Sequence, residues 1–73
     1  MARETIEVPI TGKIISVSVK SGDKIKEGDV ICTLESMKME NPILAPVSGI
    51  ILEVGVKEDQ VVKPGEIIAV IEY

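Results

Sequence analysis

The sequence predicts an all-β domain, a flattened antiparallel β-barrel or sandwich built from two halves related by a pseudo-twofold axis. Three observations lead to this prediction: the apolar residues are mostly β-branched, they alternate with polar residues, and the chain repeats itself after 37 residues. Twelve Ile and ten Val dominate the apolar content, and Tyr73 is the only aromatic residue. Such stiff, β-branched side chains pack well on a pleated sheet, and no segment holds a helical apolar stripe.

Length and composition limit what the chain can do. Seventy-three residues suffice for one domain, so residues 1–73 are expected to share one core. The chain has no His and a single Cys32, which excludes an internal disulfide, a Cys/His zinc site and His-based catalysis. A net charge of −4 argues against nucleic-acid binding. Without a long apolar run or a signal-peptide core, we expect no membrane insertion and a cytoplasmic location.

The strands follow from local patterns. Residues 15–19 alternate so that Ile15, Val17 and Val19 share one face, and residues 52–56 and 5–8 repeat this alternation. Residues 30–34 and 66–71 are almost continuously apolar, which predicts strands that are covered on both faces. Cys32 lies within the first of these runs and is expected to be an inert, buried thiol.

An internal repeat organises these strands. Residues 9–36 align with residues 46–73 without a gap, and 10 of the 28 pairs are identical. A repeat too small to bury its own apolar face must associate with its copy, so we expect two interlocked halves. Closure into a barrel would leave no exposed strand edges. Four glycines are predicted to occupy turns that need unusual φ angles: Gly12, Gly28, Gly49 and Gly65.

The segment between the half-repeats, residues 37–45, has no counterpart in the repeat and is predicted to form a tight hairpin. Lys38 is expected at its tip, between Met37 and Met39. If strand alternation holds, the two methionines share the face opposite Lys38. They could fill gaps in the core or meet partner proteins, because Met packs in many environments.

The hairpin sequence Glu35-Ser36-Met37-Lys38-Met39-Glu40 resembles the biotin attachment motif of biotin carboxyl carrier domains. Ser36 stands where most members have Ala. Residues 45–49 and 8–12 resemble the two Pro-x-x-Gly turns of the family, although Ile10 replaces the usual Met. The resemblance extends from about residue 7 to residue 72, and Lys38 keeps the family's usual distance of 35 residues from the C-terminus.

The resemblance implies a function and a set of partners. A biotin protein ligase would attach biotin to Lys38, and the tethered biotin would carry a carboxyl group between active sites. The partner components would be a biotin carboxylase and a carboxyltransferase or decarboxylase, and the domain itself would not be an enzyme. The flanking residues would serve recognition: Glu35, Ser36, Met37, Met39 and Glu40. Glu35 has Glu72 as its repeat mate, so a structural role for Glu35 stays open.

Two further comparisons refine the expected class. Residues 19–26 align without a gap to residues 56–63, which leaves no room for the protruding thumb of some acetyl-CoA carboxylase carriers. This favours a carrier of the decarboxylase, pyruvate-carboxylase-like or stand-alone type. A lipoyl carrier would share the fold and the hairpin, but lipoyl domains usually have Asp-Lys where this chain has Met37-Lys38. An interaction module with this fold commonly lacks the modified lysine. The absence of His and of recognisable paired carboxylates argues against an independent enzyme.

Overall fold

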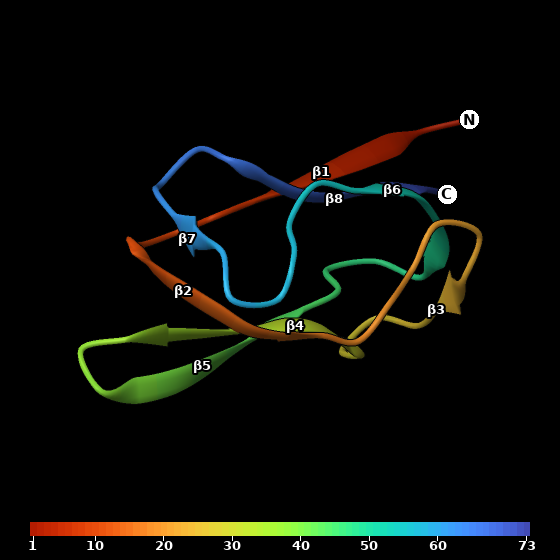
Figure 1. Cartoon of the computed structure of the whole chain (residues 1–73). Coiled ribbons are helices and arrows are strands. Elements are labelled where there is room, and N and C mark those ends of the chain that lie inside the picture. The colour runs from red at the N-terminus through yellow and green to blue at the C-terminus, as the bar shows by residue number, and fades with distance from the viewer.

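Two four-stranded antiparallel sheets form the domain, and the computed structural model describes all residues from 1 to 73 (Figure 1). The eight strands are β1 (Arg3–Glu7), β2 (Gly12–Val17), β3 (Lys24–Ile25), β4 (Val30–Ser36), β5 (Met39–Leu44), β6 (Gly49–Val54), β7 (Val61–Val62) and β8 (Ile67–Glu72). One sheet has the order β1-β8-β6-β3 and the other β5-β4-β2-β7. The chain has no helix that could cross a membrane. The prediction of an all-β sandwich is confirmed.

The two halves exchange strands between the sheets. A shift of 37 residues carries β1, β2, β3 and β4 onto β5, β6, β7 and β8, and it converts the strand order of one sheet into that of the other. Each half therefore gives two strands to each sheet. Within one half only a single pair forms, β2 with β4 or β6 with β8, so each four-stranded sheet needs strands from both halves. This fits the expectation that a repeat of this size buries its apolar face against its copy.

The structural repeat is longer than the repeat in the sequence. Strand β5, inside the predicted linker 37–45, is the structural mate of β1, although only Ile6 and Ile43 are identical between residues 2–8 and 39–45. The prediction that residues 37–45 have no counterpart is therefore wrong, except for the turn Met37-Lys38. The counterpart of that turn would join the chain ends, where Ala2 and Tyr73 exchange backbone hydrogen bonds of 2.8 and 2.9 Å.

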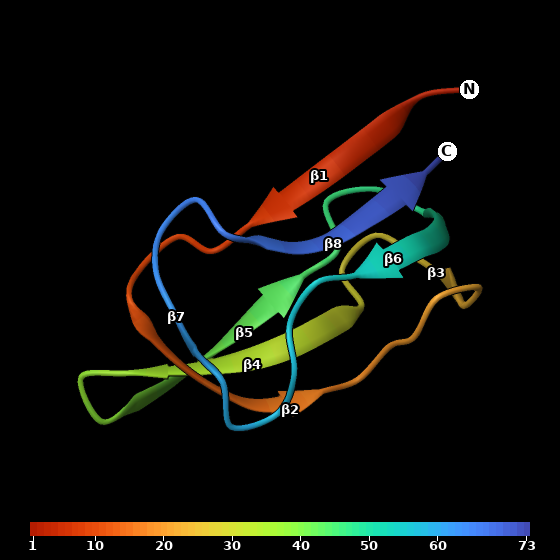
Figure 2. The ribbon, with the colours of Figure 1, turned by 45° about the horizontal axis from the view of Figure 1, so that its top comes forward.

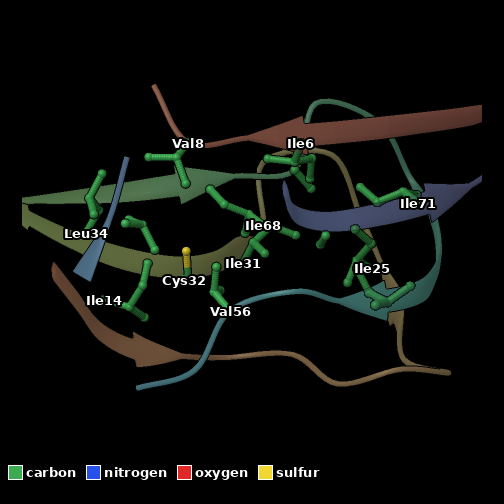
Figure 3. Close-up of a cluster of buried hydrophobic side chains, with 14 residues drawn as sticks. Ile6, Val8, Ile14, Ile25, Ile31, Cys32, Leu34, Val56, Ile68 and Ile71 are labelled. Carbon is green, nitrogen blue, oxygen red and sulfur yellow. The ribbon is translucent and has the colours of Figure 1, made fainter. Parts of the chain in front are cut away.

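Between the two sheets lies a core of 14 buried apolar residues (Figure 3). Twelve of them form six pairs of repeat mates: Val8 and Ala45, Ile14 and Ile51, Ile25 and Val62, Ile31 and Ile68, Cys32 and Ala69, Leu34 and Ile71. Cys32 is fully buried, and this burial raises the pKa of its thiol, because a thiolate would lose its hydration there. The prediction of a buried thiol is confirmed, and its inertness stays a prediction.

β-Bulges correct two sequence predictions about the strands. The register shifts where Ile31 and Ile68 are inserted, so each adds a buried residue to a strand whose other face stays open to solvent. Strands β4 and β8 are therefore not covered on both faces. Similar shifts at Ile15 and Leu52 place Ile14 and Ile51 in the core and leave Ile15 half-buried, against the predicted alternation.

The four predicted turn glycines divide into two kinds. Gly28 and Gly65 have φ angles of 92° and 93°, as predicted. Gly12 and Gly49 do not have positive φ. A Cβ at Gly12 would instead collide with the backbone oxygen of Glu35, and one at Gly49 with that of Glu72. Close approach of two strands, not turn conformation, requires glycine at these two positions.

No strand pairing joins the two sheets at their edges, so of the predicted barrel or sandwich the domain forms the sandwich. The edge strands are β1 and β3 in one sheet and β5 and β7 in the other. Two of these edges, β3 and β7, are only two residues long. Figure 2 shows β1 along the outer border of its sheet, with no other segment beyond it.

The pairing of core residues predicts matched stability losses. Ile31→Ala and Ile68→Ala should each lower the free energy of unfolding by about 2–5 kcal/mol, because both side chains are fully buried. Denaturant titration followed by circular dichroism measures both. Val61→Ala is the control, since Val61 is 67% exposed and should cost no more than about 0.5 kcal/mol. A severe loss in one Ile variant and none in the other would contradict the paired core.

Candidate functional site

The hairpin of β4 and β5 projects from one end of the elongated domain, whose longest extent is 36 Å (Figure 1). Both chain ends lie at the opposite end, in both views of the ribbon (Figures 1 and 2). The last strand pair of the hairpin joins Ser36 to Met39, which leaves Met37 and Lys38 as the two residues of the turn. The structure thus places Lys38 at the tip of a β-hairpin.

The turn has an unfavourable conformation for its residues. Met37 and Lys38 have φ angles of 54° and 65°, the pattern of a type I′ turn. Such turns fit the twist of a two-residue hairpin but favour Asn and Gly, because a side chain in the left-handed region costs about 1–2 kcal/mol. The turn therefore retains two residues that destabilise it. Conformational stability alone does not explain why Met and Lys occupy these positions.

Both methionines are exposed. Met37 has 91% of its surface accessible to solvent, and Met39 has 66%. The alternative that they fill gaps in the core is therefore excluded. Their predicted common face is also wrong, because Met37 belongs to the turn, where strand alternation does not apply. Two flexible thioethers thus flank an exposed amine and give the tip an apolar surface around one cation.

Lys38 itself is exposed, and the only ion pair of the domain lies elsewhere, between Lys13 and Asp59 at 3.6 Å. None of the three surface depressions of the domain includes a residue from 35 to 40. There is also no group of His, Cys, Asp or Glu side chains that could hold a metal ion. The amine is thus presented on a protrusion rather than inside a pocket.

The acidic residues of the motif lie side by side. Glu35 and Glu40 are direct cross-strand neighbours in the hairpin, and both are exposed. Like charges in this position are destabilising. Lys13 is the register neighbour of Glu35 on the opposite side, in β2, but its ion pair is with Asp59 and not with Glu35. Ser36 is half-buried opposite Met39. The structure therefore brings all six motif residues together around the tip.

Asn41 also supports the hairpin, and the sequence analysis did not identify it. Its side-chain amide donates a hydrogen bond of 3.3 Å to the backbone oxygen of Met39. Asn is unusual in a strand, so the pair Asn41-Pro42 could have indicated a special role for this residue. Gly12 is a second such residue, because it lets β2 approach the backbone of Glu35 closely.

These features together describe a rigid support that displays one primary amine. Strand β4 is anchored in the core by Cys32 and Leu34, which are fully buried, while the tip four residues beyond Leu34 is free. Because the hairpin tip protrudes, it can enter the active site of a larger protein. The arrangement is suited to covalent modification of the amine by another protein.

The comparisons with known proteins agree with this description. Residues 4–71 match the family described as "Biotin-requiring enzyme", and the chain belongs to this family. The gamma subunit of glutaconyl-CoA decarboxylase from Acidaminococcus fermentans is 55% identical over 40 residues, which cover 55% of this chain and 28% of that protein. The biotinylated protein TB7.3 of Mycobacterium tuberculosis is 48% identical over 42 residues, covering 58% of this chain and 59% of that protein.

A solved structure of a lipoyl domain has the same fold. The lipoyl domain of the 2-oxoglutarate dehydrogenase complex from Azotobacter vinelandii superimposes with a TM-score of 0.82 at 24% identity, covering 94% of this chain and 95% of that domain. At this identity the likeness concerns the fold alone. The fold therefore does not distinguish a biotin carrier from a lipoyl carrier, whereas the family match and the similarity to a biotinylated protein favour biotin as the cofactor.

The strained turn generates a prediction. Met37→Asn should raise the free energy of unfolding by about 0.5–1 kcal/mol, because Asn tolerates the left-handed conformation. The matched control is Met39→Asn, since Met39 is an exposed neighbour that lies in strand β5. We expect no gain there, because Asn is disfavoured in strands. Urea titration of both variants tests this, and equal effects at the two positions would contradict strain at Met37.

Proposed function

We propose that this domain is a biotin carboxyl carrier and that Lys38 is the residue to which biotin is attached. The main support for this proposal is the position of Lys38. It is exposed in a two-residue turn, at the end of the domain opposite the chain ends. Membership of the biotin-requiring family supports biotin as the group attached. Residues 1–73 would then form a single biotinyl attachment domain.

The attachment chemistry explains why the amine is so exposed. A biotin protein ligase would supply a biotinyl group activated on its carboxyl carbon. The neutral Nζ of Lys38 attacks this carbon, an amide bond forms, the activating group leaves with its bonding electrons, and a base of the ligase takes the ammonium proton. A lysine is mostly protonated at neutral pH, so the base and the oxyanion stabilisation must come from the ligase. The hairpin contributes position.

After attachment, the domain would act by transport rather than by catalysis. Biotin accepts a carboxyl group at one active site and releases it at another, while the β-sheet keeps the tether at a fixed place. Tethering gives the cofactor an effective concentration on the order of millimolar at each site. The partners would be a biotin carboxylase and a carboxyltransferase or decarboxylase component. The similarity to a decarboxylase gamma subunit supports the decarboxylase type among these alternatives.

The residues around the turn would mediate recognition by these partners. Met37 and Met39 offer exposed apolar contacts beside the amine, and the neighbouring carboxylates of Glu35 and Glu40 offer charge. A partner that places a cation near this carboxylate pair would relieve its repulsion on binding. Ser36 would keep the base of the turn narrow. A cytoplasmic location stays a prediction.

The position of the lysine can be tested directly. Lys38→Arg should abolish biotinylation, because a guanidinium stays protonated and cannot attack, while stability should change by no more than about 0.5 kcal/mol. The measurement is intact mass and avidin binding after incubation with a biotin protein ligase, biotin and ATP. Lys13→Arg, on a neighbouring strand, is the control and should be modified like the parent. Biotin on any other lysine of Lys38→Arg would contradict the proposed site, and a lipoyl adduct on protein from cells would select the lipoyl carrier.

A further inference from the structure

The edge strands β1 and β5 are equivalent by the pseudo-symmetry, but they differ in how well their open edges are protected. In β5, the residues whose backbone groups point away from β4 include Pro42, which has no N–H to offer. The mate of Pro42 in β1 is Thr5, which has a normal N–H. Proline is one of the ways by which proteins protect an edge strand from pairing with another chain. Edge β5 is protected in this way, and edge β1 is not.

The backbone groups of β1 alternate between its partner and the open edge. Ala2 exchanges two hydrogen bonds with Tyr73, and Val8 exchanges two with Gly65 and Glu66 of the opposite chain segment. By the antiparallel alternation, the intervening even-numbered residues also bond toward β8. The N–H and C=O groups of Arg3, Thr5 and Glu7 therefore point outward. All three residues are exposed, and β1 is the border of its sheet (Figure 2).

The three outward residues form a self-complementary sequence. When two copies of β1 meet in antiparallel orientation with Thr5 opposite Thr5, Arg3 of each copy lies opposite Glu7 of the other. Threonine pairs and opposite charges are both favourable as direct cross-strand neighbours. A register shifted by two residues places Arg3 or Glu7 opposite Thr5 and breaks both charge pairs. Only the register centred on Thr5 pairs all three outward residues.

The geometry points to β1 as an interaction surface for a second copy of this chain, in which two β1 strands pair antiparallel about Thr5 and join the two four-stranded sheets into one. The contact is isologous, so it closes as a dimer and does not extend into a filament. Charged residues usually protect an edge because they repel a copy of themselves. Here the register converts them into two equivalent attractive pairs, Arg3 with Glu7 and Glu7 with Arg3.

The dimer leaves the hairpins free. Strand β1 runs from the end of the domain that holds the chain termini toward the end that holds the hairpin (Figure 2). Antiparallel pairing therefore directs the two Lys38 hairpins to opposite ends of the assembly. The inference uses no property of biotin and stands or falls separately from the proposed function of Lys38.

Sedimentation velocity at low salt, from about 10 µM to about 1 mM of the chain, tests the inference. We expect the average mass of the parent to rise toward that of a dimer with concentration. Thr5→Pro copies the solution found in β5 and should weaken dimerisation at least about tenfold. A parent that stays monomeric throughout, or a folded Thr5→Pro variant that dimerises like the parent, would overturn the inference.

Charge exchange tests the register and does not depend on how the fold accepts proline. Arg3→Glu and Glu7→Arg should each weaken dimerisation at least about tenfold, because each places like charges opposite one another twice. The double variant Arg3→Glu/Glu7→Arg restores the opposite-charge pairs and should return to within about threefold of the parent. Glu58→Arg, at an exposed residue between β6 and β7, changes the net charge as Glu7→Arg does and should dimerise like the parent. A double variant no better than the single ones would overturn the proposed pairing.

Discussion

Exchange of strands between the two halves is the constraint on which the rest of this domain depends. Each half contributes two strands to each sheet, so a half alone has neither a complete sheet nor a covered apolar face. The buried mates Ile31 and Ile68 lie in different sheets, in β4 and β8, and meet in the one core between them (Figure 3). A small domain without disulfides or metals needs such a shared core, since its surface is large relative to its volume.

The core stabilises the hairpin indirectly, through strand β4. Strand β4 is held on both sides, by β2 and β5, and its inward residues Cys32 and Leu34 are fully buried. The tip can therefore hold two residues in a conformation that neither favours. Strain at a position that other contacts fix is typical of functional sites. The base of the hairpin is therefore stabilised by the core, while the sequence of the tip is not determined by the stability of the fold.

Much of the fold could be predicted from the sequence because the repeat identifies equivalent turns. The hairpin position of Lys38 followed from the same reasoning, although Met37-Lys38 lacks the Asn-Gly signature of its turn type. The register was not accessible, because an inserted residue such as Ile31 changes which face its neighbours occupy and leaves no mark in the composition. The role of Gly12 was also missed, since close approach of strands depends on tertiary structure.

The relation between β1 and β5 could not be recognised for a similar reason. An edge strand needs only backbone pairing and one inward side chain, so residues 2–8 and 39–45 keep a single identity, Ile6 with Ile43. The two edges were then free to diverge, one with Pro42 and the other with Thr5. The same structural position therefore leads into the Lys38 turn in β5 and forms an open edge in β1.

The mutual hydrogen bonds of Ala2 and Tyr73 have a topological consequence. They correspond to the pair Ser36 and Met39, which encloses a turn of two residues, and Met1 already occupies the place equivalent to Lys38. One additional residue between Tyr73 and Met1 would complete the second turn and give a circular chain of two equal repeats. Such a circular chain would have no termini. Closure of the backbone would stabilise the native fold by reducing the entropy of the unfolded chain. Each end of the molecule would then have a two-residue turn, and Lys38 would lie in only one of them.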